Sequence, residues 1–143
     1  MKLICLIDNT SVDEKLYAED GVSFLVELGG KYYLIDAGLT GKAAENARRM
    51  KQPVDNLESI VITHNHFSHI GGIDSFTRLN PRAEIYLRAG AQTEYFKKTG
   101  LFKEPAGAGR SFFRKYEDRL ILFNSFSEVT EGFYLASCEV FEE

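Results

Sequence analysis

The chain has 143 residues, 44% of them hydrophobic and 13% aromatic, which predicts one globular domain over residues 1–143 and excludes a disordered chain. Its formal net charge of −4 argues against a nucleic-acid partner, because binding to phosphates requires clustered lysines and arginines. No apolar run approaches the length of a transmembrane helix and no signal peptide is visible. We therefore expect a cytoplasmic protein without a membrane partner.

The first sixty residues combine apolar runs with clear turn signals. Four of these runs predict strands, at residues 2–7, 22–28, 31–35 and 59–63. Gly29-Gly30 predicts a two-residue hairpin between the second and third strands. Thr40 is placed to cap a helix over residues 41–51, which Pro53 ends. Cys5 lies in the first strand and is expected to be a small buried residue.

The second half of the chain gives weaker signals. Its expected elements are helices at 73–79 and 91–98, and strands at 83–87, 112–116, 119–123 and within 128–135. Tyr95 and Phe96 should face the interior, and Glu117-Asp118 should turn a hairpin. Residues 100–110 are rich in glycine and predict a flexible loop. This mixture of strands and helices places the chain in the α/β class.

All three histidines lie in one motif, Thr63-His64-Asn65-His66-Phe67-Ser68-His69-Ile70-Gly71-Gly72. The motif follows a predicted strand, and open α/β sheets place their sites at the carboxyl ends of strands. His64 and His66 can point the same way in an extended segment, and His69 follows closely enough to join them. Neutral imidazole is a common ligand of zinc, so the spacing predicts a metal site. The alternative interpretation is three polar residues on a surface loop.

This motif resembles the H-x-H-x-D-H signature, followed by Gly-Gly, of the metallo-β-lactamase superfamily. Residues 33–38 resemble the strand and D-x-G turn that precede the signature in that family. Asp8-Asn9-Thr10 and residues 18–25 are similar to a subgroup related to the ribofuranosylaminobenzene phosphate synthases and similar metal-dependent hydrolases. The resemblance implies one or two metal ions, zinc first and iron or manganese as alternatives, with His64, His66 and His69 as ligands.

The family fold is a four-layer αββα sandwich built from two similar halves, and the resemblance is clear over about the first 80 residues. Family members supply further ligands downstream, whereas this sequence has no histidine after His69. The resemblance therefore implies the N-terminal half of the fold. Because one half would leave a face of its sheet uncovered, we expect a homodimer or a separately encoded C-terminal half as partner.

Three aspartates are candidate site residues. Asp36 stands in the D-x-G turn, where the family carboxylate supports a histidine ligand and fixes its tautomer; the alternative is an aspartate that caps a helix or forms a turn. The aspartate of the signature is Ser68 here, and a neutral serine is a poor zinc ligand. A general base would then come from Asp8, Asp20 or a partner chain, although Asp8 equally suits a turn.

Two functions fit these observations. The first is a metal-dependent hydrolase in which the ion lowers the pKa of water for attack on an ester, lactone, thioester or phosphoester of a small molecule. The second is a catalytically silent metal-binding or assembly module, which Ser68 and the missing downstream ligands favour. A fragment of a longer product is a further interpretation, and Cys138 is a weakly supported additional ligand.

Overall fold

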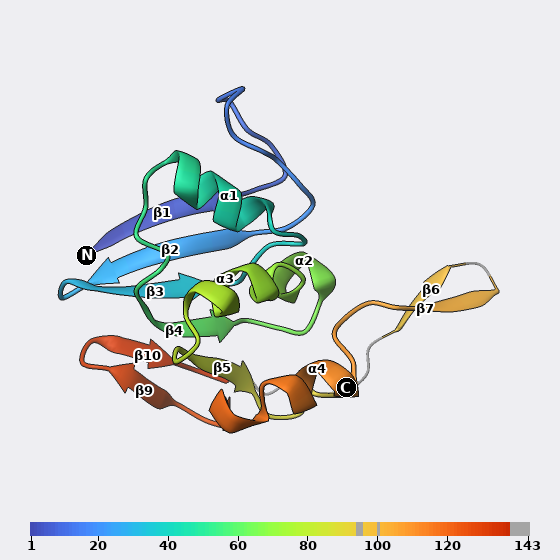
Figure 1. The fold of residues 1–143 in the computed structure, drawn as a ribbon. Helices are drawn as coiled ribbons and strands as arrows, with labels where there is room; N and C mark the ends of the chain where they lie inside the picture. The colour runs from blue at the N-terminus through green and yellow to red at the C-terminus, as the bar shows by residue number, and fades with distance from the viewer. Residues whose placement is uncertain (94–95, 100, 138–143) are drawn as a thin grey trace.

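The computed structural model of the chain describes residues 1–93, 96–99 and 101–137. A six-stranded sheet with the strand order β1-β2-β3-β4-β5-β8 forms its centre (Figure 1). The strands are β1 (Lys2–Ile7), β2 (Ser23–Leu28), β3 (Lys31–Ile35), β4 (Leu57–Ile62), β5 (Glu84–Arg88) and β8 (Leu120–Phe123). The first three are antiparallel neighbours, whereas β3, β4, β5 and β8 run parallel to one another. The predicted α/β class is confirmed.

The elements before residue 64 lie within two residues of their predicted bounds. Gly29 and Gly30 have φ angles of 59° and 79°, which a two-residue hairpin of this hand requires and which glycine adopts without steric cost. Helix α1 (Lys42–Arg49) has Gly41 as its N-cap, so the prediction that Thr40 occupies this position is wrong by one residue; the Oγ1 of Thr40 still accepts a hydrogen bond from the Lys42 backbone N–H at 3.3 Å. Local sequence signals are strong here, so the predicted and observed elements agree apart from the capping residue.

The hydrophobic core lies between the sheet and a layer of helices. Helix α1 and helix α3 (Ile73–Leu79) lie on one face of the sheet, and the short helix α2 (Phe67–Ile70) precedes α3 (Figure 1). Side chains of this core are fully or almost fully buried; they include Leu25, Leu34, Ile60, Ile62, Ile85, Leu87, Ala43, Ala47, Ile73 and Phe76. None of the described helices is long and apolar enough to cross a bilayer.

A C-terminal hairpin covers part of the opposite sheet face. It consists of β9 (Ser127–Thr130) and β10 (Phe133–Leu135), and the Phe133 ring packs edge-on against Tyr33 with centroids 5.2 Å apart. Leu3 and Cys5 of β1 pair with Val26 and Phe24 of β2. The side chains of Leu3 and Cys5 are exposed. The prediction of a buried Cys5 is therefore wrong, because the hairpin covers the sheet around Tyr33 and leaves the β1 edge open.

The predictions for residues 91–116 are wrong in three places. Residues 91–93 form a turn and Phe96–Thr99 form the strand β6, so the predicted helix is absent from the described part of this segment. Phe96 is exposed, and Tyr95 lies outside the described residues. The predicted flexible loop contains β7 (Phe102–Pro105), and the predicted strand at 112–116 is the helix α4 (Arg110–Lys115).

The last of these errors has a topological cause. Strand β8 pairs with β5 in parallel, and a parallel connection needs a crossover rather than a tight turn. Helix α4 and a short 3₁₀ helix at Glu117–Arg119 form part of that crossover. The residues Glu117 and Asp118 are therefore not the turn of a β-hairpin. The predicted strands at 83–87 and 119–123 are confirmed, as are the helix at 73–79 and the last strand.

Candidate functional site

The histidines lie in the loop that leaves the carboxyl end of β4. The chain is extended at His66, which is the N-cap of α2 with φ −109° and ψ 148°, and the single helical turn that follows carries His69 back toward the strand. The ring of His64 is 4.8 Å from the ring of His66 and 3.9 Å from that of His69, measured between centroids. The structure thus brings the three predicted imidazoles to one place.

Asp36 lies directly behind this loop, at the end of the neighbouring strand β3. It is 2% exposed, and its φ of 57° is in the left-handed region that residues other than glycine seldom adopt. Its Oδ1 accepts a hydrogen bond from the Thr63 backbone N–H, and its Oδ2 accepts one from the Thr63 hydroxyl, each at 2.8 Å. The Nδ1 of His69 is also 2.8 Å from Oδ2. The strained backbone therefore aims one buried carboxylate at two residues of the histidine motif.

The donors and acceptors of this network fix the tautomers of two histidines. An ionised carboxylate only accepts hydrogen bonds, so the Nδ1 of His69 carries a proton, and in the neutral ring the lone pair is then on Nε2. The single hydroxyl proton of Thr63 is donated to Asp36, so Thr63 Oγ1 accepts from the Nδ1 of His64, 3.1 Å away. His64 therefore also keeps its Nε2 lone pair. Thr63 is a site residue that the sequence analysis missed, although it is the first letter of the motif.

The electrostatic surroundings favour the neutral form of His64. Burial lowers its pKa, and the imidazoles of His69 and His66 lower it further, whereas the Asp36 carboxylate acts in the opposite direction. Only a neutral imidazole has a lone pair for a metal ion, so the environment keeps His64 in the form that can act as a ligand.

A buried glutamate holds the D-x-G turn in place. Glu19 Oε1 accepts hydrogen bonds from the backbone N–H groups of Leu39 and Thr40, both at 3.0 Å, and its Oε2 accepts one from the Thr40 hydroxyl at 2.6 Å. The sequence analysis named the neighbouring Asp20 and missed Glu19. Since Glu19 is almost completely buried while Asp20 is exposed, Glu19 is the residue that links the 8–20 loop to the turn carrying Asp36.

The remaining aspartate candidates occupy less central positions. Asp8 is exposed, and its Oδ1 accepts a hydrogen bond from the Asn9 backbone N–H at 2.7 Å, which is the bond of a turn-forming residue. Ser68 is half-buried in α2, and its carbonyl accepts from Val22 N–H at 3.2 Å. Roles of Asp8, Asp20 and Asp36 in catalysis stay predictions.

The histidine motif meets some, but not all, of the requirements of a site for a divalent metal ion. Two imidazoles held with Nε2 lone pairs are the nitrogen ligands that zinc prefers. Among the residues that the structure describes, however, no group of three or more His, Cys, Asp or Glu side chains is arranged to hold a metal ion. Ligation by His64, His66 and His69 together stays a prediction, and Cys138 lies outside the described residues.

Comparison with known proteins identifies the family of this arrangement. Residues 16–122 match the sequence model of the metallo-β-lactamase superfamily. The chain belongs to this superfamily. A metal-dependent hydrolase of Aeropyrum pernix is 35% identical over 95 residues, which are 62% of this chain and 37% of that protein. Exodeoxyribonuclease WalJ of Streptococcus pneumoniae is 42% identical over 60 residues, 41% of this chain and 22% of that protein.

Solved structures share the fold of this chain. A metal-dependent hydrolase, Tm1679, superimposes with a TM-score of 0.70 at 22% identity, over 94% of this chain and 46% of that one. A quorum-quenching N-acyl homoserine lactone lactonase gives a TM-score of 0.54 at 19% identity, over 80% of this chain and 49% of that one. The chain therefore spans less than half the length of the relatives and structures named here.

Proposed function

We propose that the chain is a metal-dependent hydrolase whose site is built on the histidine motif. The observation that carries this proposal is the Asp36 network, in which one buried carboxylate sets the tautomers of His64 and His69 directly and through Thr63. Histidines that bind a metal ion usually donate their other ring N–H to a carboxylate or a carbonyl, and this hydrogen bond fixes the orientation of the ring. Three histidines that were only polar residues of a surface loop would not need a buried carboxylate to orient their rings.

The protein's own residues would bind the metal ion and orient the imidazole rings, while the ion would act as the electrophile. His64, His66 and His69 would hold the ion, zinc first and iron or manganese as alternatives, and Asp36 would keep their rings turned toward it. When bound, a divalent ion lowers the pKa of water and polarises the oxygen of the bond under attack. Ester, lactone, thioester and phosphoester bonds of small molecules are the proposed substrate classes, and the name of the Aeropyrum pernix relative supports hydrolysis.

The finer assignment to the synthase-like subgroup rests on Asp8-Asn9-Thr10 and on residues 18–25. In the second stretch, Glu19 and Gly21 border the site. A Cβ at Gly21 would come within 2.6 Å of the Ser68 carbonyl oxygen, so the α2 turn lies directly against this segment. The subgroup pattern thus coincides with residues that shape the histidine loop. We propose it as the nearest functional class, with the substrate of this chain to be identified by screening.

Metal content measured by elemental mass spectrometry tests the proposed hydrolase. We expect about one or two zinc or iron ions per chain in tag-free protein, and loss of that metal together with any hydrolysis in the His66→Ala variant. Glu58→Gln is the matched control, because Glu58 lies on the same strand-and-loop segment but at the opposite end of β4, paired with Lys31 on the surface. Retention of metal and hydrolysis by His66→Ala would contradict the assignment.

A silent metal-binding module is the second candidate function, because Ser68 stands where the superfamily signature has an aspartate. Replacing Ser68 with aspartate separates the two. If a working site merely lacks one oxygen ligand, Ser68→Asp should raise zinc affinity by about tenfold or more, and Ser68→Asn should not, since it adds similar volume without the charge. Isothermal titration with zinc gives the affinities. Equal affinities in all three proteins would favour the silent module.

A further inference from the structure

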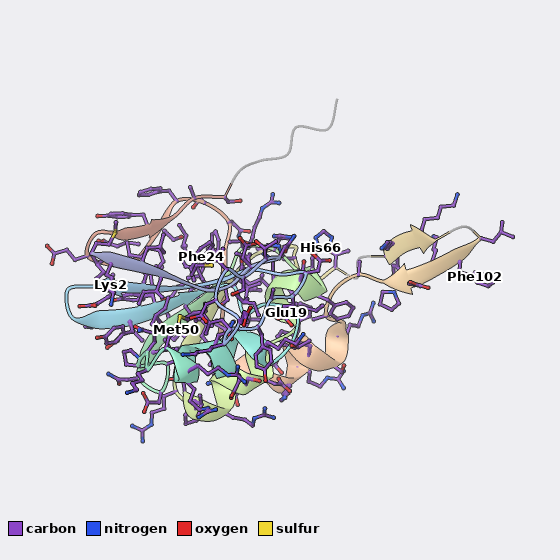
Figure 2. All side chains as sticks on the ribbon, turned by 90° about the horizontal axis from the view of Figure 1, so that it is seen from above. Lys2, Glu19, Phe24, Met50, His66 and Phe102 are labelled. Atoms are coloured by element: carbon purple, nitrogen blue, oxygen red, sulfur yellow. The ribbon has the colours of Figure 1, made fainter. Side chains whose placement is uncertain are left out.

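The chain between β5 and β8 leaves the body of the molecule as the β6–β7 hairpin and returns to it beside the histidine motif. Figure 2 shows His66 on the side of the body from which this hairpin extends, with Phe102 near the far end of the hairpin. After β7, the carbonyl of Ala106 accepts a hydrogen bond from the backbone N–H of Phe67 at 2.9 Å. Phe67 follows His66 directly, so the returning chain bonds to the motif itself.

Asn65 holds the chain on both sides of this hairpin. It is 2% exposed, and its Nδ2 donates to the carbonyls of Ala91 and Ala108 at 2.9 and 3.0 Å. Its Oδ1 accepts a hydrogen bond from the Ala108 N–H at 2.8 Å. Ala91 precedes the hairpin and Ala108 follows it. A single buried amide therefore fastens both ends of the hairpin segment to the middle of the histidine motif.

The returning segment lies directly against the backbone of Asn65. A Cβ at Gly107 would overlap the Asn65 carbonyl oxygen and would come within 2.8 Å of its Oδ1. A backbone oxygen cannot rotate away as the end of a flexible side chain can, so only glycine allows this close approach. Gly107 is itself buried. Residues 106–108 thus support the histidine loop from the side of Asn65.

The turn at Asn65 sets the relation between two of the histidines. The backbone N–H of His66 donates to the carbonyl of His64 at 3.0 Å, which closes a three-residue turn with Asn65 at its centre. The rings of His64 and His66 have centroids 4.8 Å apart and planes at 90° to each other. In so short a turn, the backbone angles of the central residue decide the separation of the two flanking side chains. A constraint on Asn65 is therefore a constraint on both imidazoles.

Asn80 shows what a buried amide does elsewhere in this chain. Its Nδ2 donates to the carbonyls of Val54 and Phe76 at 2.6 and 3.0 Å. Its Oδ1 accepts from the N–H of Leu57 at 2.8 Å, and Asn80 is 5% exposed. Leu57 is the first residue of β4, whereas the histidines follow the last residue of that strand. Asn80 therefore matches Asn65 in burial and in its hydrogen bonds, but it lies at the other end of β4.

We propose that Asn65 is a positioning residue of the histidine site. Its amide, held by the chain on both sides of the β6–β7 hairpin, fixes the turn that sets the separation of the His64 and His66 imidazoles. The Asp36 network sets the tautomers of His64 and His69, whereas Asn65 fixes the backbone between His64 and His66. Residues 106–108 offer no side chain that could bind an ion, yet the geometry of the site depends on them. This role rests on the proposed function only in so far as metal binding is one of its readouts.

Titration of Asn65→Ala and Asn80→Ala with zinc tests the role of Asn65. Each substitution removes a buried amide, so each should lower the free energy of unfolding measured in urea. Only Asn65→Ala should weaken zinc binding, by about tenfold or more. It should also change the visible spectrum of Co²⁺ added in place of zinc, because that spectrum reports ligand geometry. Circular dichroism shows that the variants are folded during titration. Equal zinc affinities in folded Asn65→Ala and wild type would overturn the proposal.

Gly107→Ala disturbs the same contact without removing a hydrogen-bonding group. Its Cβ would displace the backbone of Asn65, so zinc affinity should fall here as well. This variant decides the question if Asn65→Ala does not fold. A folded Gly107→Ala protein with the zinc affinity of the wild type would contradict the proposed role.

Nuclear magnetic resonance of the imidazole nitrogens in metal-free protein separates the role of Asn65 from the proposed hydrolase. Residue 107 is distant in sequence from the histidines, so altered ring signals of His64 and His66 in Gly107→Ala report a change transmitted through Asn65. Asn80→Ala should leave these signals unchanged. If the wild type binds no zinc but the signals change in Gly107→Ala alone, the metal site is refuted and the positioning role stands. If the wild type binds zinc and the signals are unchanged in Gly107→Ala, the positioning role is refuted and the metal site stands.

Discussion

Replacing Asp36 with asparagine is expected to lower zinc affinity by about 10- to 100-fold, the usual cost of removing a group that orients metal-binding histidines. The carboxylate accepts hydrogen bonds at both oxygens, from Thr63 N–H at Oδ1 and from His69 and the Thr63 hydroxyl at Oδ2. An amide has one accepting oxygen and one donating nitrogen. In either orientation, therefore, the amide nitrogen of asparagine faces a hydrogen-bond donor of Thr63 or His69.

The two orientations of the amide damage the site in different ways. With its nitrogen toward His69, asparagine makes Nδ1 the acceptor, which moves the proton to Nε2 and removes the lone pair that the ion needs. With its nitrogen toward Thr63 N–H, it leaves a partly buried backbone donor unpaired, at a cost of up to about 1 kcal/mol in the free energy of unfolding. Zinc titration and urea unfolding together show which orientation the variant adopts.

Thr63→Val and Glu58→Gln complete this experiment. Valine keeps the shape of threonine but removes the hydroxyl that links Asp36 to His64, so it should weaken zinc binding less than Asp36→Asn, because the direct bond to His69 remains. Glu58 is an exposed carboxylate at the other end of β4, and its substitution should change neither measurement. Unaltered zinc affinity in Asp36→Asn would show that this network does not orient ligands.

The sequence predicts the part of the fold that local signals determine. Gly29-Gly30 between two apolar runs specifies a hairpin without reference to the rest of the chain, and Pro53 ends a helix in the same local way. The region 91–116 lacks such signals. Phe112, Phe113 and Tyr116 form an apolar run that suggests a strand, whereas their three- and four-residue spacing also matches the helix face that packs Phe113 and Tyr116 into the core.

The candidate site is predictable only where a single segment carries it. The three histidines stand within six residues of one another, so their grouping is legible in the sequence. The functions of Glu19 and Asn65 depend on partners 20 to 43 residues away, which only the folded chain brings together. Nothing in the local sequence shows that Glu19, and not the neighbouring Asp20, is buried and accepts hydrogen bonds from a distant turn.

Replacing Gly72 with alanine is expected to lower the free energy of unfolding by about 3 kcal/mol, because a Cβ there would overlap two backbone carbonyl oxygens. Those oxygens belong to Ala37 and Thr40, in the turn that follows Asp36, and neither can move as a flexible side chain would. The φ of Gly72 is −81°, which alanine adopts freely, so the whole cost is steric. Gly29→Ala is the converse control: its Cβ would meet no atom within 4 Å, but its φ is positive.

Gly29→Ala should therefore cost only about 1–2 kcal/mol, the usual strain of a left-handed backbone at a residue with a Cβ. The two variants should also differ in zinc binding. Gly72 N–H donates to the Gly38 carbonyl at 3.0 Å, and Ala37 N–H donates to the His69 carbonyl at 2.6 Å, so these loops position His69 against Asp36. Displacing them in Gly72→Ala should weaken zinc binding, whereas Gly29→Ala should not. Equal stability and equal zinc affinity in the two variants would mean that the close approach of these loops is not what aligns the histidine with its carboxylate.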